Sequence, residues 1–229
     1  MSDKGTGFVI AASGLRAEAR IASRSGGVRA VAGGSDTARL DDLARQLAAQ
    51  GAEAIISFGI AAGLAPQYSA GACLIGREVV FAGDSYSADP AWTASIKKLV
   101  GSADVVRIAG VDRPLAHPSE KQALCMASGA AAADMESHLV ARIAAELVLP
   151  FAILRVIADP AERELPPAAL AGMRADGRLN VGAVLASLAR NPGQLPALIR
   201  LAAEAGRAGA ALLRCSDRLG PRLGFRDLS

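Results

Sequence analysis

Short apolar segments alternate with helical patterns along most of the chain, and this alternation limits the possible folds more than any other feature. The apolar runs typical of buried strands cover residues 8–12, 54–58, 73–81, 105–109 and 151–157. Apolar residues recur at helical spacing over residues 15–21, 36–50, 136–148, 180–190 and 194–213, and another helical pattern opens at 166–167. Strands that alternate with helices predict an α/β fold with a mainly parallel or mixed central sheet flanked by helices.

The 229 residues contain no internal repeat and no low-complexity linker. We therefore expect one domain over residues 1–229, in which residues 194–229 form a C-terminal basic helical segment. The longest uncharged stretch, residues 54–76, could span a bilayer, but several glycines and Pro66 interrupt it. We interpret it as strand, loop and strand, with a glycine-rich turn at residues 59–63.

The charge and cysteine content exclude several classes of function. The net charge is only +3, and aromatic residues make up 3% of the chain, so we expect no nucleic-acid partner. Three scattered cysteines and two histidines cannot form a metal cluster at the usual spacings, so we expect no metal ion. The N-terminus lacks the apolar core of a signal peptide, and we expect a cytoplasmic protein.

Ligands of open α/β sheets bind at the carboxyl ends of the strands. In this chain that rule points to residues 13–18, 59–63 and 111–114 and to Asp159. The candidate substrate contacts within these loops are Ala61, Ala62, Gly63, Val111 and Asp112.

Acidic residues in apolar surroundings are few, and each has a structural alternative. Asp134 and Glu136 follow an alanine-rich run and open a helix, where they could serve only as charges at the helix N-terminus. Asp159 ends an apolar strand that contains Arg155, and it could be a turn residue before Pro160. Glu18 could be a solvated helix position. The residues alone leave these alternatives open.

Four segments, in this order, resemble the superfamily of nucleoside phosphorylases and nucleosidases, which includes methylthioadenosine/adenosylhomocysteine nucleosidases. They are residues 9–19 (VIAASGLRAEA), 56–66 (ISFGIAAGLAP), 132–137 (AADMES) and 150–159 (PFAILRVIAD). Within the superfamily, the first two segments are most similar to the hopanoid-associated phosphorylase branch. The resemblance extends from residue 8 to about residue 190.

The resemblance implies a role for each acidic residue. Asp159 takes the position of the acid that protonates the departing purine, and Glu18 that of the glutamate that activates water. Glu136 takes the position of the residue that binds the ribose hydroxyls, with Met135 packing on the sugar. No metal or organic cofactor is implied, although inorganic phosphate can be a co-substrate, which Arg16 and Gly14 would then contact.

The chain also departs from the family pattern. Ala158 stands where relatives usually have a serine before the aspartate, and Ile60 stands where many have serine or threonine. Ser57 replaces a phosphate-binding arginine of the hexameric phosphorylases. These losses favour hydrolysis slightly over phosphorolysis.

The resemblance therefore predicts an enzyme that cleaves the N-glycosidic bond of a 5′-substituted adenosine, with adenosylhopane as the expected substrate and adenine and a ribosyl hopanoid as products. One alternative is a methylthioadenosine/adenosylhomocysteine nucleosidase. Another is a non-catalytic nucleoside-binding module of the same fold. A homo-oligomer, in particular a homodimer, is expected from the nucleosidase relatives.

Arginines repeat every seven residues near the C-terminus, at Arg200, Arg207 and Arg214, so they line one stripe of a helix. Arg218, Arg222 and Arg226 follow this repeat. The apolar surface of the segment is supplied by Leu195, Leu198, Ile199, Leu201, Leu212 and Leu213. One interpretation is a final helix that packs on the core and exposes its charged face. The other is a peripheral contact with an anionic membrane at the inner face, which would bring the enzyme to a lipid-linked substrate.

Overall fold

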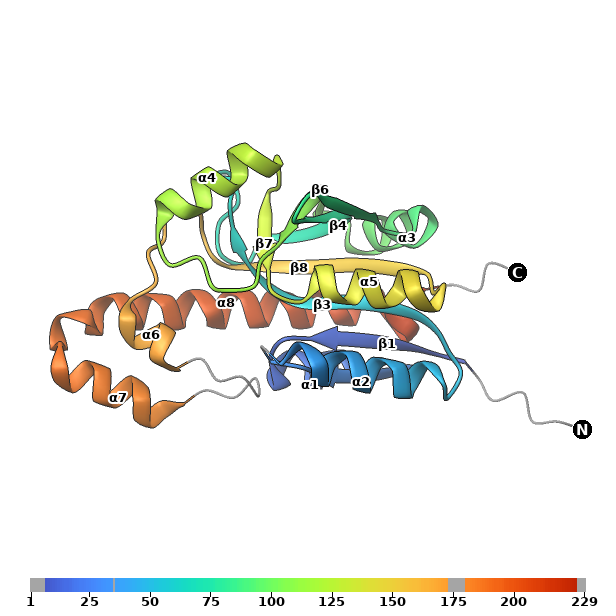
Figure 1. Ribbon diagram of the computed structural model, residues 1–229, viewed down its shortest axis with the longest axis horizontal. Helices are drawn as coiled ribbons and strands as arrows, with labels where there is room; N and C mark the ends of the chain where they lie inside the picture. The colour runs from blue at the N-terminus through green and yellow to red at the C-terminus, as the bar shows by residue number, and fades with distance from the viewer. Residues whose placement is uncertain (1–6, 35, 173–179, 226–229) are drawn as a thin grey trace, which may run out of the picture.

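The apolar runs of the sequence form a mixed sheet of eight strands, with helices on both of its faces (Figure 1). The computed structural model describes residues 7–34, 36–172 and 180–225. The strands are β1 (Phe8–Ser13), β2 (Val28–Ala32), β3 (Ala52–Gly63), β4 (Cys73–Phe81), β5 (Asp84–Ser87), β6 (Asp104–Gly110), β7 (Ala132–Asp134) and β8 (Phe151–Asp159). The α-helices are α1 (Arg16–Ala22), α2 (Thr37–Ala48), α3 (Pro90–Val100), α4 (Pro118–Ser128), α5 (Ser137–Leu147), α6 (Pro167–Gly172), α7 (Val181–Arg190) and α8 (Leu195–Leu219).

The long strand β3 organises the sheet. It pairs in parallel with β1 and β8, and its last residues pair antiparallel with the short β7. The strands β3, β8, β4, β6 and β7 pair in this order, and β7 returns to β3, so they form a closed ring. Ala62 of β3 pairs with Ala133 on one side and with Asp159 on the other. This register brings the ends of β7 and β8 to the same edge of the sheet.

Helices cover both faces of the sheet, and this explains why the strands are apolar throughout. In β1, Phe8, Ile10 and Ala12 contribute to the core under α2 and α5, whereas Val9 and Ala11 contribute to the core under α1, α3 and α8. Successive side chains of a strand point to opposite faces, so a strand buried on both sides has no polar positions to alternate with.

The expected α/β fold with a mixed sheet is confirmed, and one local prediction is wrong. Residues 59–63 are not a glycine-rich turn, because β3 continues to Gly63. Pairing with β8 on one side and with β7 at the end holds this segment extended despite its two glycines. Gly76 lies next to a shift in the register between β4 and β6.

The last long helix, α8, has two different halves. Its second half packs against the sheet through buried residues that include Ala208, Ala211, Leu212, Cys215 and Leu219. The first half extends with α6 and α7 beyond the end of the sheet (Figure 1). In the described part of the chain, no helix is both long and apolar enough to cross a membrane.

Candidate functional site

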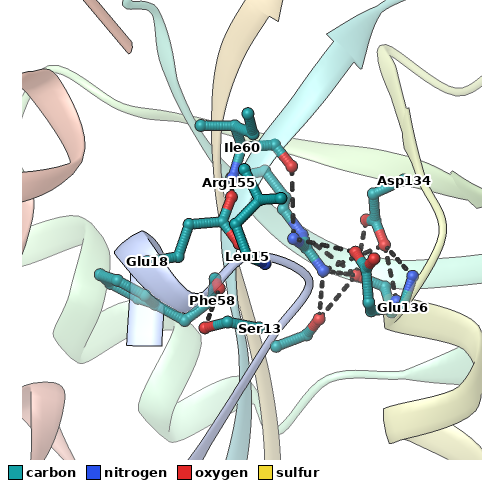
Figure 2. A network of polar contacts seen from close by, with 10 residues as sticks. Ser13, Leu15, Glu18, Phe58, Ile60, Asp134, Glu136 and Arg155 are labelled. Carbon is teal, nitrogen blue, oxygen red and sulfur yellow. Dashed lines mark hydrogen bonds and ion pairs between the residues drawn. The ribbon is translucent and has the colours of Figure 1, made fainter. Parts of the chain in front are cut away.

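Four buried charged residues meet where α1, β3, β8 and the start of α5 come together (Figure 2). They are Glu18, Asp134, Glu136 and Arg155. They come from three segments of the chain: α1, the junction of β7 and α5, and β8. The cluster therefore forms only when these three segments have come together.

Glu18 is buried on α1, which excludes the interpretation as a solvated helix position. Its carboxylate accepts hydrogen bonds from the backbone N–H of Leu15 at 2.8 Å and from that of Ile60 at 2.9 Å. A Cβ atom at Gly59 would lie 2.8 Å from the Glu18 carboxyl carbon, so this close approach requires glycine. Burial raises the pKa of Glu18, and the Arg155 guanidinium opposes that rise.

Arg155 lies in the middle of β8 and is fully buried. Its guanidinium is 3.0 Å from the Asp134 carboxylate and also donates to the hydroxyls of Ser57 and Ser137. Asp134 in turn accepts from the backbone N–H groups of Glu136 and Ser137. Asp134 therefore does cap α5, as the structural alternative proposed, and at the same time neutralises the buried arginine.

Glu136 precedes α5 and is buried, with its carboxylate 3.6 Å from an Arg155 nitrogen. Burial raises its pKa to about 8; Arg155 opposes that rise, and Asp134 and Glu18 add to it. The backbone of Gly14 packs against this carboxylate so closely that a Cβ atom there would lie 2.5 Å from an oxygen. Three carboxyl groups thus share one buried cation, which favours retention of protons at the site.

Asp159 lies at the end of β8 and is mostly buried. Its carboxylate accepts a hydrogen bond at 2.7 Å from the ammonium of Lys121, a fully buried residue of α4. The same ammonium donates to the carbonyl oxygens of Pro160 and Arg163, each at 2.9 Å. Burial raises the pKa of Asp159, and Lys121 opposes the rise.

The remaining predicted contacts lie around this edge of the sheet. Ala61, Ala62 and Gly63 form the end of β3, and Met135 is half-buried between Asp134 and Glu136. The backbone N–H of Val111 donates to the carbonyl oxygen of Asp134, at 2.9 Å. Asp112 is exposed, with one oxygen 3.6 Å from the buried imidazole of His138, which stacks on Phe81.

Arg16 does not join the carboxyl cluster. It lies two residues before Glu18 on α1, so the two side chains leave different sides of the helix. Arg16 instead lines a groove of about 580 Å³ together with Arg20, Arg24 and Arg39. Gly14 packs on Glu136 and does not line this groove, so the phosphate contact of Arg16 and Gly14 stays a prediction.

Two functional candidates were missed in the sequence. Arg155 gave a usable signal, since a charge inside an apolar strand must find a buried partner. Lys121 gave none, because its partners lie about forty residues further along the chain. The described residues contain no cluster of three metal-ligating side chains.

A comparison with models of known protein families finds a match for this chain. A family model described as the phosphorylase superfamily matches residues 39–191, more than half of the chain. The chain belongs to the phosphorylase superfamily. The match includes Lys121, Asp134, Glu136 and Asp159, whereas Glu18 precedes it. A comparison with curated protein sequences found no match.

Solved structures of other proteins share the fold of this superfamily member. A variant of the 5′-methylthioadenosine nucleosidase of Helicobacter pylori is 14% identical, with a TM-score of 0.65, and the match covers 93% of this chain and 99% of that one. The corresponding nucleosidase of Streptococcus pneumoniae is 16% identical, with a TM-score of 0.64 and the same coverage. A futalosine hydrolase of H. pylori is 17% identical, with a TM-score of 0.60, covering 80% of this chain and 97% of that one.

Proposed function

We propose that the protein hydrolyses the N-glycosidic bond of a 5′-substituted adenosine. The observation that carries this proposal is the pairing of Ala62 with Asp159 and with Ala133, which brings the acid at the end of β8 to the sheet edge that holds Glu136 and Glu18. An N-glycosidic bond needs three kinds of help: an acid on the base, a polar anchor on the sugar and activation of the nucleophile.

The proposed reaction uses one carboxyl group for each task. The Asp159 carboxyl donates a proton to N7 of the purine as the bond between C1′ and N9 breaks and its electron pair moves into the base. Glu136 accepts hydrogen bonds from the ribose hydroxyls, and Met135 packs on the sugar. Glu18 removes a proton from water as the water oxygen bonds to C1′. The products are adenine and a 5′-substituted ribose.

The electrostatics of the cluster suit these assignments. Burial raises the pKa of Asp159, so the carboxyl group can carry the proton that it must donate. Burial also raises the pKa of Glu18, which brings a general base closer to neutral pH. The two backbone N–H donors on Glu18 fix its orientation toward the site.

Water is the better nucleophile for this arrangement than phosphate. The Ser57 hydroxyl is occupied by Arg155, and the backbone N–H of Ile60 by Glu18. Arg16 lines a separate groove. Mass spectrometry of the sugar product, with and without phosphate, tests this point: free 5′-substituted ribose in both reactions supports hydrolysis, and a ribose 1-phosphate would establish phosphorolysis.

Adenosylhopane remains our proposed substrate, with methylthioadenosine or adenosylhomocysteine as the alternative. A non-catalytic binding module of the same fold is less well supported. Ile60 contributes to the site through its backbone, so its apolar side chain leaves the contacts of Glu18 and Arg155 intact. We also propose that the protein is cytoplasmic and forms a homodimer. Light scattering of the purified protein would test the dimer.

The surface of α7 and the first half of α8 favours contact with a lipid surface. Four of the eight large hydrophobic side chains that are exposed in the described residues lie here: Val181, Leu185, Leu195 and Ile199. Arg190, Arg200 and Arg207 are exposed on the same two helices. Apolar side chains flanked by arginines suit the interface of an anionic membrane.

The proposed membrane contact is narrower than the arginine repeat of the sequence. Leu212 is buried, Arg218 donates to the carbonyl oxygen of Val100, and Arg222 pairs with Glu53. Arg226 lies outside the described residues. Arg214 is exposed, but it lies on the second half of α8, which packs on the core. We therefore limit the proposed contact surface to residues 181–207.

A further inference from the structure

Lys121 has no role in the reaction proposed above, yet its ammonium makes several hydrogen bonds inside the protein. It is the one fully buried lysine among the described residues. A buried ammonium is costly unless every donor has a partner. Lys121 meets that condition with one carboxylate oxygen and two carbonyl oxygens at 2.7–2.9 Å.

All three partners lie in one short segment, the end of β8 and the turn that follows it. The carbonyl oxygens belong to Pro160 and Arg163, and the carboxylate is that of Asp159. The backbone N–H of Leu165 also donates to the carbonyl oxygen of Ala116, just before α4. The start of α4 therefore fixes both the Asp159 carboxylate and the backbone of the turn that follows it.

The contact leaves part of the Asp159 carboxylate available. Lys121 donates to Oδ2, and no other side chain among the described residues hydrogen-bonds this carboxylate. The preceding residue, Ala158, has no hydroxyl that could orient it. The Asp159 side chain keeps 13% of its surface exposed, so the carboxyl group that Lys121 fixes can still reach a purine.

We propose that Lys121 is the positioning residue that holds Asp159 and its turn in the orientation required to protonate the purine. This inference rests on the proposed function. Lys121 acts through Asp159 and does not contact the substrate. A turn fixed at three points prevents the displacement of a catalytic group by about 1 Å that can lower turnover by roughly 10²-fold.

The charge of Lys121 has a second consequence. The charged groups around Asp159 are Lys121 on α4, Glu204 on α8 and Arg163 in the turn, and Arg163 is paired with Glu204. Lys121 lowers the pKa of Asp159, whereas burial and Glu204 raise it. Removal of the ammonium therefore leaves the proton on Asp159 to higher pH.

The kinetic test compares Lys121→Met, which keeps length and removes charge, with Lys121→Arg, which keeps charge. Lys98→Met, on the exposed side of α3, is the control. We expect kcat of Lys121→Met to fall by about 10²-fold with little change in KM. The alkaline limb of its kcat/KM profile should move to higher pH, whereas that of Lys121→Arg should stay near the wild-type position. An equal loss at all pH values, with no shift of the limb, would show a merely structural role.

A double-mutant cycle keeps the inference testable even if no nucleoside is cleaved. Lys121→Met and Lys121→Gln are each combined with Asp159→Asn, and thermal unfolding midpoints are measured. We expect either lysine substitution to lower the midpoint more in the wild-type background than in the Asp159→Asn background, because the lysine then has less to hold. Strictly additive losses in the unfolding midpoint would show that Lys121 and Asp159 are not coupled and would overturn the proposal. If the wild-type protein cleaves no nucleoside but the cycle shows coupling, the proposed function is rejected, whereas the positioning of Asp159 by Lys121 still stands.

Discussion

The carboxylate of Glu18 accepts a hydrogen bond from the backbone N–H of Ile60, 2.9 Å away. The contact joins α1 to β3 across more than forty residues of sequence, and it fixes the carboxylate over Gly59. Ile60 thus serves the site through its backbone. This is why an apolar side chain at this position is compatible with an organised cluster of acids.

Glu18→Gln tests whether Glu18 activates the water that attacks C1′. Glutamine keeps the length of the side chain and one acceptor oxygen, so it can accept from only one of the two backbone N–H groups, and it cannot take a proton from water. We expect turnover to fall by roughly 10²–10⁴-fold, the usual contribution of a general base. Steady-state kinetics of purified Glu18→Gln would measure this, with the exposed Glu164→Gln as the matched control. Turnover within a few-fold of the control would remove Glu18 from the mechanism.

Glu136→Gln tests the sugar anchor. If Glu136 binds the ribose more tightly in the transition state than in the ground state, kcat should fall while KM changes little. A substrate without the 2′-hydroxyl should lose less from the mutation. Kinetics of the wild-type and variant enzymes on ribo- and 2′-deoxyribo-substrates would measure the difference. The same loss on both substrates would show that Glu136 does not bind the ribose and acts only as a charge at the N-terminus of α5.

The pH dependence of stability tests the buried proton. The pKa of Glu136 is raised from 4.5 to about 8 in the folded protein. Between these values the unfolded chain releases a proton that the folded protein retains, so stability falls as the pH rises through this window. Glu136→Gln cannot ionise and should flatten the fall. Denaturant unfolding at pH 5 and pH 8 would measure it, and an unchanged difference between the two pH values would contradict the raised pKa.

The exposed residues of α7 and α8 predict weak, reversible binding to anionic vesicles. Each basic residue near such a surface strengthens binding by roughly fivefold, and salt screens this contribution. Co-sedimentation should be stronger with anionic than with neutral lipids and weaker at high salt. Leu185→Ser with Ile199→Ser should reduce it further, whereas Val148→Ser, at another exposed apolar site at the end of α5, should not. Equal sedimentation under all conditions would rule out the contact.

The parts of the fold that follow from local periodicity could be predicted. Phe8–Ser13, Ser137–Leu147 and Phe151–Asp159 are largely apolar or helically spaced, and they form the expected elements. Residues 59–63 misled the prediction because glycine signals a turn locally, whereas strand pairing on both sides decides the backbone here.

The site could be predicted only in part. A resemblance to a family could nominate Glu18, Glu136 and Asp159, since their neighbours in sequence carry the pattern. The partners that set their charge states could not be nominated in this way. Arg155 reaches Asp134 across the sheet, and Lys121 reaches Asp159 from helix α4, so both contacts depend on tertiary packing.

Release of free adenine is the most direct test of the central claim. Purified wild-type protein is incubated with adenosylhopane, methylthioadenosine and adenosylhomocysteine, and adenine is quantified by chromatography. We predict adenine from at least one of them, with a rate roughly 10²–10⁴-fold lower for Asp159→Asn, which keeps the shape of the side chain but cannot donate the proton. No adenine from any of the three, or equal rates for wild type and Asp159→Asn, would contradict the account.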